Sequence, residues 1–282
     1  MTDDLEWVVA CRAGEIQGEG TTRHVTDTGT SLRALFELSG RSAIVTGASS
    51  GLGERLARAL AEAGARVAVT ARRADRLERL ASDIGGAALP ADLLDLESIP
   101  DLVARAADLV GSPEILINAA GDRVSDRPAE DEALEAVRKT IDLNLVAPFR
   151  LAQAVYPYME AMNRGSIVNI SSISGHVGVG GIPQASYAAS KMGLSGLTAE
   201  LAIQWAPRSI RVNTVAPGFF RSEITEPLYE SERGRSWLRR NTPLPYEATT
   251  NDLVGMVLCL ASDAGRFITG QTIVVDGGWV AR

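Results

Sequence analysis

The stretch Ser42-Ala43-Ile44-Val45-Thr46-Gly47-Ala48-Ser49-Ser50-Gly51-Leu52-Gly53 decides the fold. Its first five residues form a short apolar run typical of a buried strand, and a helix follows with Leu52, Leu56 and Leu60 on one face. A strand, a glycine-rich turn and a helix make the arrangement that binds a dinucleotide, because glycine lets the backbone approach a pyrophosphate and the helix start offers free N–H groups. We therefore predict a cofactor site at this turn.

Further strand-like runs follow, separated by stretches of helical periodicity. They cover residues 66–70, 87–92, 114–118, 166–170, 210–215 and 272–275. Strands that alternate with helices predict an α/β fold of the Rossmann type: a doubly wound, mainly parallel, seven-stranded sheet with helices on both faces. We assign it to a single domain, residues 39–282. Residues 1–38 lack periodicity and are expected to form a poorly ordered extension, and the long charged segment 219–246 is expected to be a substrate lid.

Composition narrows the functional classes. The net charge of −7 argues against nucleic-acid and membrane-surface binding, and no apolar run approaches the ~20 residues that span a bilayer. The acidic N-terminus lacks the basic region of a signal peptide, so we expect a cytoplasmic protein. With two cysteines and two histidines, we expect neither a disulfide framework nor a metal site.

The second strand-like run ends in two arginines, Arg72 and Arg73. NAD-binding versions of the fold carry an acidic residue near this point, which takes the ribose hydroxyls. A guanidinium instead suits a 2′-phosphate, so we predict NADP, with NAD as a possibility. The alternative is that both arginines are solvated residues that open the next helix.

Tyr187 and Lys191 are four residues apart in a run of small residues that suits a helix. Positions i and i+4 share one helix face, so the phenol and the ammonium would lie side by side. A neighbouring cation would lower the pKa of the phenol from its usual ~10 and make it a usable acid and base. The alternative is a pair of this spacing on a solvated helix face.

Asn144 lies in the middle of a helical stretch from about residue 131 to 163, with Pro148 four positions later. Proline has no N–H group, so the carbonyl of Asn144 loses its usual donor. We expect an ordered water to take that place, and a simple helix kink is the alternative.

With these elements in place, residues from about 39 to 282 resemble the short-chain dehydrogenase/reductase family. The matching motifs are Thr46-Gly47-Ala48-Ser49-Ser50-Gly51-Leu52-Gly53, Asn118-Ala119-Ala120-Gly121, Asn144, Ser172, Tyr187-x-x-x-Lys191, Pro217-Gly218 and Gly270-Gln271-Thr272-Ile273-Val274-Val275-Asp276-Gly277-Gly278. Within the family, gluconate 5-dehydrogenase-like and 3-oxoacyl-carrier-protein reductase-like branches fit nearly equally well.

The resemblance implies an NADP(H)-preferring oxidoreductase that interconverts a secondary alcohol and a ketone. It implies four catalytic residues: Tyr187 as general acid/base, Lys191 as the cation that lowers its pKa, Ser172 as the group that holds the substrate oxygen, and Asn144 as the holder of a relay water. The implied cofactor contacts are Gly47, Ser49, Ser50, Gly51, Leu52, Gly53, Arg72, Arg73, Asp92, Leu93, Asn118, Ala119, Gly121, Tyr187, Lys191, Pro217, Gly218, Phe220 and Ser222. It also implies a homo-oligomer, a tetramer or a dimer, with the Asn144 and Tyr187 helices at the interface.

Some features leave alternatives open. Ser171 competes with Ser172 for the substrate oxygen, and Asp92 could contact the adenine or cap the turn that follows. Leu244-Pro245-Tyr246-Glu247 replaces the family's usual Arg-x-Gly after the lid, so the means of anchoring the lid is open. The rival function is a non-catalytic NAD(P)-sensing protein on the same fold, which would not need Ser172, Tyr187 and Lys191 together.

Overall fold

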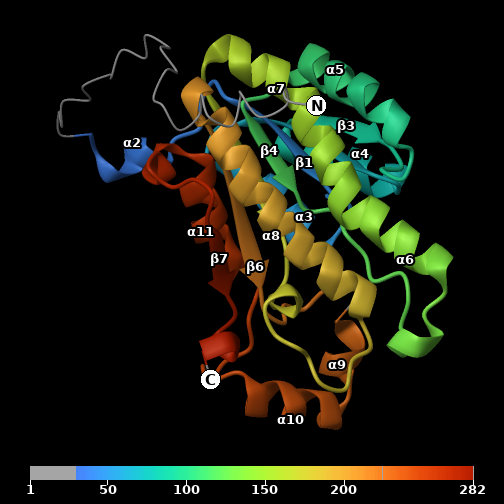
Figure 1. Ribbon diagram of the computed structural model, residues 1–282. Helices are drawn as coiled ribbons and strands as arrows, with labels where there is room; N and C mark the ends of the chain where they lie inside the picture. Colours follow the sequence, from blue (N-terminus) through green and yellow to red (C-terminus); the bar gives the residue numbers. More distant parts are fainter. Residues whose placement is uncertain (1–29, 224, 282) are drawn as a thin grey trace, which may run out of the picture. The chain divides into compact units, whose positions relative to one another are not determined.

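The computed structural model describes residues 30–223 and 225–281. Over these residues seven strands form one sheet in the order β3-β2-β1-β4-β5-β6-β7, and every neighbouring pair is parallel (Figure 1). The strands are β1 (Ser42–Thr46), β2 (Arg66–Ala71), β3 (Ala87–Pro90), β4 (Ile115–Asn118), β5 (Gly165–Ile170), β6 (Ile210–Pro217) and β7 (Thr272–Val275). The predicted fold class is confirmed.

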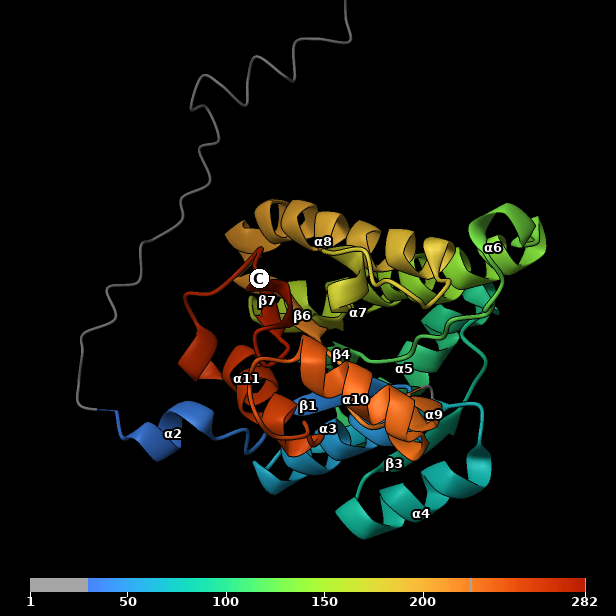
Figure 2. The ribbon, with the colours of Figure 1, turned by 90° about the horizontal axis from the view of Figure 1, so that it is seen from below.

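The alternation of side chains along each strand explains why helices cover both faces. In β1, Ala43 and Val45 enter one core cluster while Ile44 enters the other, because successive side chains point to opposite faces. The first cluster packs α3 (Gly51–Glu62), α4 (Ala74–Ile84) and α11 (Asn251–Ala261); the second packs α5 (Ile99–Val110), α7 (Ala147–Met162) and α8 (Ala185–Trp205). Figure 2 shows α7 and α8 on one side of the sheet and α3 and α4 on the other.

The long helical stretch before β5 is interrupted. It consists of α6 (Leu134–Ile141), a π-helical turn over Asp142–Val146, and α7, with Pro148 in the first turn of α7. A proline removes one backbone donor, and a wider turn is one way for a helix to continue past such a point. The predicted irregularity at Asn144 is therefore present as a π-turn.

The described fold begins ahead of residue 39. A short helix, α2 (Leu32–Phe36), is capped by the Ser31 hydroxyl, and Leu38 is fully buried, with its N–H donating to the Ala63 carbonyl at 2.8 Å. The predicted extension otherwise falls on residues 1–29, which lie outside the described residues. In the part of the chain that is described, none of the helices has both the length and the apolar character needed to cross a bilayer.

The segment after β6 carries two helices, α9 (Glu226–Glu230) and α10 (Glu232–Asn241). Three aromatic rings hold α10 against the C-terminal turn: Phe219, Trp237 and Trp279 lie with ring centroids 4.8–5.2 Å apart. The Leu244 N–H also donates to the Gly277 carbonyl at 3.0 Å. Aromatic packing and this backbone contact anchor the segment in place of the missing Arg-x-Gly.

Candidate active site

A cavity of about 830 Å³ opens at the carboxyl ends of the strands. Its wall includes residues that directly follow or end β1, β2, β4 and β6, among them Gly47, Arg72, Ala119 and Pro217. The strand order reverses between β1 and β4, and open α/β sheets bind ligands at such a switch point. The volume is within the range of small-molecule and cofactor sites.

Two glycines of the glycine-rich turn, Gly47 and Gly53, have no space for a side chain. Gly47 has φ +65°, and a Cβ placed on it would lie 2.7 Å from the backbone of Ala120. A Cβ on Gly53 would lie 2.4 Å from the carbonyl oxygen of Gly47. Thr46 fixes the neighbouring loop, because its hydroxyl oxygen accepts the N–H groups of Ala119 and Ala120, both at 3.1 Å. Turn and loop therefore approach each other as a bare backbone surface on the cavity.

The first turn of α3 lies on this surface, with Gly51, Leu52 and Gly53 on the cavity wall. The preceding residue Ser50 does not cap the helix with its side chain. Uncapped N–H groups and the positive end of the helix dipole favour an anion such as a pyrophosphate. The turn thus fits the predicted dinucleotide, and every predicted cofactor contact lines the cavity except Asn118.

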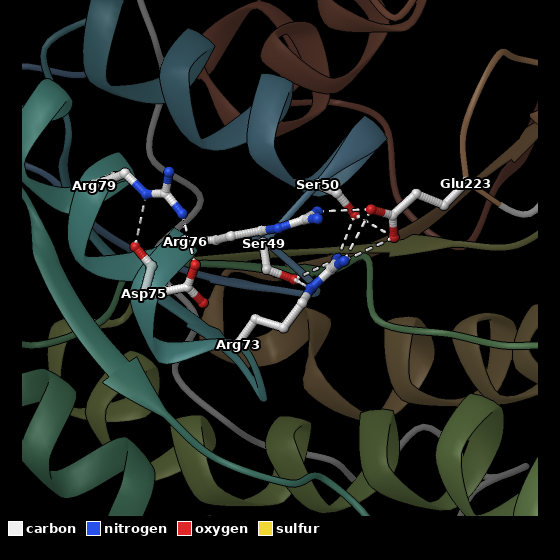
Figure 3. Close-up of polar contacts among 7 residues, drawn as sticks. All are labelled: Ser49, Ser50, Arg73, Asp75, Arg76, Arg79 and Glu223. Carbon is white, nitrogen blue, oxygen red and sulfur yellow. Dashed lines mark hydrogen bonds and ion pairs between the residues drawn. The ribbon is translucent and has the colours of Figure 1, made fainter.

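Arg73 folds over the glycine-rich turn. Its guanidinium donates to the Ser49 hydroxyl at 2.9 and 3.0 Å, to the Ser50 hydroxyl at 2.7 Å and to the Glu223 carboxylate at 2.8 and 2.9 Å (Figure 3). Arg72 is exposed and also lines the cavity. Arg73 directly precedes α4, as expected if it simply opened the next helix, but its side chain lines the cavity.

Tyr187 and Lys191 lie in the first turns of α8 and both line the cavity. The Lys191 ammonium is buried, donates to the Ile170 carbonyl at 2.8 Å, and lies 5.7 Å from the centroid of the Tyr187 ring. Burial lowers the pKa of Lys191 to about 8. Burial raises the pKa of Tyr187 above its usual value, and Ser172 and Arg123 oppose that rise. The role of Lys191 in lowering the pKa of Tyr187 stays a prediction, and in this structure its ammonium donates to the β5 carbonyl of Ile170.

The two serines after β5 have different partners. Ser171 donates its hydroxyl to the Lys191 carbonyl at 2.7 Å and is nearly inaccessible, with 4% of its surface exposed. The Ser172 hydroxyl is partly exposed and pairs with the hydroxyl and N–H of Ser174 at 3.2 Å. Ser172 is therefore the serine of the two whose hydroxyl is open to a ligand.

Asn144 does not line the cavity, but its side chain hydrogen-bonds the loop after β4 and helix α8, which both contribute to the cavity wall. Its fully buried side chain accepts the Asp122 N–H at 2.9 Å and donates to the Asp122 carbonyl and the Ser190 hydroxyl, both at 3.0 Å. A Cβ on Gly121 would lie 2.9 Å from the Lys191 Nζ and 3.2 Å from the Asn144 Oδ1. The Lys191 ammonium and the Asn144 amide oxygen therefore both lie close to Gly121. The relay water predicted at the Asn144 carbonyl stays a prediction.

Two predicted cofactor contacts have structural partners of their own. Asn118 is 2% exposed and donates to the Asn169 side chain at 2.8 Å, away from the cavity wall. Asp92 lines the cavity and its carboxylate accepts the Leu94 N–H at 3.1 Å, so the capping alternative is present.

Sequence reasoning missed several residues that the fold brings to the cavity. Arg123, Ser174, Gln184 and Glu223 all line it, and Gln184 donates to the Ser174 hydroxyl at 3.0 Å. Arg123 had a signal, since it lies two positions after Gly121, the last of the small residues that follow β4. Glu223 had none, because its partners are about 150 positions away in the sequence.

The start of α8 is held by a distant acid. The Glu132 carboxylate accepts both the N–H of Ser186, at 3.3 Å, and the Ser186 hydroxyl. A carboxylate at a helix N-terminus satisfies free donors and interacts favourably with the helix dipole. This contact fixes the helix turn that carries Tyr187.

Comparison with known proteins agrees with this site. The family model described as enoyl-(acyl carrier protein) reductase matches residues 47–280. Gluconate 5-dehydrogenase of Gluconobacter oxydans is 36% identical over 249 residues, which cover 86% of this chain and 96% of the relative. The 3-oxoacyl-acyl-carrier-protein reductase of Rickettsia conorii is 38% identical over 247 residues, covering 86% and 98%. The crystal structure of a gluconate 5-dehydrogenase from Burkholderia cenocepacia in complex with NADP and tartrate matches with a TM-score of 0.83 at 32% identity, covering 89% of this chain and 100% of that one. The predicted membership is confirmed: the chain belongs to the short-chain dehydrogenase/reductase family and is an NAD(P)-dependent oxidoreductase.

Proposed function

We propose that this protein is an NADP(H)-preferring oxidoreductase that interconverts a secondary alcohol and a ketone. The observation that carries the proposal is the presence of Ser172, Tyr187 and Lys191 on the wall of the cavity that the glycine-rich turn also lines. A nicotinamide cofactor supplies or accepts the hydride when bound there.

In the reducing direction, the Ser172 hydroxyl hydrogen-bonds the ketone oxygen and holds the carbonyl carbon in place. Tyr187 donates its proton to that oxygen as the C–H bond forms, which leaves a phenolate. The Lys191 ammonium stabilises the phenolate, and Asn144 keeps the Lys191 helix and the loop after β4 at a fixed separation. In the oxidising direction the Tyr187 phenolate takes the hydroxyl proton.

The NADP preference rests on the two arginines after β2 and on the absence of an acid at that point. Both line the cavity, and Arg73 already binds a carboxylate there. The B. cenocepacia relative was solved with NADP. We expect Arg73→Ala to lower the NADPH/NADH ratio of kcat/KM by about 10-fold or more, since each charge-assisted contact contributes ~1.5–3 kcal/mol. Arg72→Ala should lower the ratio as well, and an unchanged ratio in both variants would refute the preference.

For the substrate we propose a polyhydroxylated acid of the gluconate class. Polar groups on the cavity wall support this choice: Ser174, Gln184 and Arg123 line the cavity, and the Arg123 charge opposes the rise in the pKa of Tyr187. Two of the relatives are named gluconate 5-dehydrogenases. A panel of sugar acids, polyols and acetoacetyl thioesters, followed by NADPH absorbance, tests it. Arg123→Gln should raise KM for the acids more than for neutral polyols, and a preference for the thioester would contradict the proposal.

The catalytic role of Tyr187 is tested by Tyr187→Phe, which removes one oxygen. We expect turnover to fall by about 10²–10⁴-fold or more, with NADPH binding unchanged in calorimetry. Tyr158→Phe, on α7 and outside the cavity wall, is the matched control and should keep full activity. Retained turnover in Tyr187→Phe would refute the mechanism.

We also propose that segment 219–246 is a substrate lid and that the protein is a homo-oligomer. Exposed apolar side chains on α6 and α8, namely Leu134, Met192 and Ile203, support an interface there. Light scattering coupled to size-exclusion chromatography tests the oligomer: a monomer at micromolar concentration would contradict it.

A further inference from the structure

Glu223, in the segment after β6, forms ion pairs with Arg73 and Arg76, which follow β2. Its carboxylate accepts from Arg73 at 2.8 and 2.9 Å, from Arg76 at 2.6 Å and from the Ser50 hydroxyl at 3.2 Å (Figure 3). Figure 3 shows both guanidinium groups directed at this one carboxylate, while Arg79 turns away to Asp75. The contact lies on the cavity wall, because Glu223, Arg73 and Ser50 all line the cavity.

The donors around Glu223 form an anion site. Two guanidinium groups and the Ser50 hydroxyl converge on it, and the Ser49 hydroxyl fixes the plane of Arg73. Arginine pairs bind carboxylate and phosphate oxygens with the same geometry. The arginines hold the pKa of Glu223 down at about 2, so the carboxylate is ionised at neutral pH. Glu223 thus stands where an exogenous anion of the same class would bind.

We propose that Glu223 is an internal competitor for the 2′-phosphate of NADP(H): phosphate binding displaces the carboxylate from Arg73 and Arg76 and releases the start of the lid. The inference rests on the proposed NADP preference. Glu223 would then weaken NADP(H) binding but leave NAD(H) binding nearly unchanged, which makes it a specificity-determining residue. It would also couple recognition of the adenosine end to movement of the segment that covers the substrate.

The contact is of a strength that a phosphate can overcome. The side chains of Arg73, Arg76 and Glu223 are 38%, 44% and 55% exposed, and ion pairs this open to solvent are weak. A ligand that must first open such a contact loses apparent affinity in proportion to the open fraction. We therefore expect removal of the carboxylate to tighten phosphate binding by about 3- to 10-fold.

The test is calorimetric titration of the full chain with adenosine 2′,5′-bisphosphate and with AMP, which differ only in the 2′-phosphate. Glu223→Gln should bind the bisphosphate about 3- to 10-fold more tightly than the wild type, with AMP affinity unchanged. The matched control is Glu226→Gln, since that lid carboxylate pairs with Arg221 outside the cavity wall; it should change neither affinity. Unchanged or weaker bisphosphate binding by Glu223→Gln overturns the inference.

Amide hydrogen exchange shows whether the bound phosphate displaces Glu223 from Arg73 and Arg76, or whether Glu223 stays in place and covers the ligand. The bisphosphate should speed amide exchange over residues 221–230 of the wild type toward the rate of unliganded Glu223→Gln. Slower exchange would mean that Glu223 stays in place, and would overturn the inference. If the wild type binds bisphosphate and AMP equally, the NADP preference fails as well. If Arg73→Ala abolishes a clear wild-type preference while Glu223→Gln changes nothing, only the role of Glu223 fails.

Discussion

Replacing Asn144 by alanine should destabilise the fold and disturb catalysis at the same time. The side chain is fully buried and makes three hydrogen bonds of 2.9–3.0 Å, two to the backbone of Asp122 and one to Ser190. The first two hold the loop after β4, and the third holds α8 one residue before Lys191. Asn144→Ala therefore removes the brace between the π-turn, that loop and the helix of the catalytic pair.

The size of the effect follows from these contacts. At a net ~1 kcal/mol per hydrogen bond, the variant loses about 3 kcal/mol, and the buried groups left without partners add to the loss. A domain of this size loses about 2–4 °C in Tm per kcal/mol, so we expect a drop of about 6–12 °C. Differential scanning fluorimetry with urea titration measures it. Because Lys191 loses its positioning, kcat should fall in the folded variant.

Asn213→Ala is the matched control. Asn213 is also fully buried, and its side chain makes two hydrogen bonds, to the Ile268 carbonyl at 2.8 Å and from the Gln271 N–H at 3.1 Å. It should lose about 2 kcal/mol and about 4–8 °C, with kcat unchanged at a temperature where it is folded. A Tm shift below about 2 °C in Asn144→Ala would refute the energetic reasoning. Equal loss of kcat in both variants would refute the positioning role.

Three further outcomes test other parts of the structure. Because burial lowers the pKa of Lys191 to about 8, kcat/KM for ketone reduction should be level below that pH and fall above it as the ammonium loses its proton; a level profile to pH 10 would contradict this. Gly53→Ala should cost about 1–3 kcal/mol in urea unfolding and weaken cofactor binding, because its Cβ meets a backbone oxygen, whereas Gly255→Ala, at an exposed position of α11, should gain about 0.5–1 kcal/mol. Trp237→Ala removes ring contacts to Phe219 and Trp279 worth ~0.5–1.5 kcal/mol each, so trypsin should cut segment 219–246 faster than in the wild type; equal cleavage rates would show that the lid is anchored elsewhere.

Local sequence was sufficient for the fold class. The apolar runs predicted the seven strands to within a few residues, because a strand buried on both faces needs apolar side chains throughout. Helices between them imply parallel pairing, and parallel pairing places all carboxyl ends at one edge. The four-residue spacing of Tyr187 and Lys191 likewise needed only the period of a helix.

What the sequence could not determine was the direction in which polar side chains point once the elements pack. Asn118 follows the right motif but turns to Asn169 on the neighbouring strand, and Lys191 directs its ammonium at the Ile170 carbonyl. The contact between Arg73 and Glu223 joins residues 150 positions apart, and no local pattern encodes it. Motif spacing thus placed the glycine-rich turn, Ser172 and the Tyr187–Lys191 pair at the cavity, because it depends on the short-range geometry of strands, turns and helices. The tertiary structure alone decided which charges and hydrogen-bonding groups meet there, because those contacts form between segments that only the folded sheet brings together.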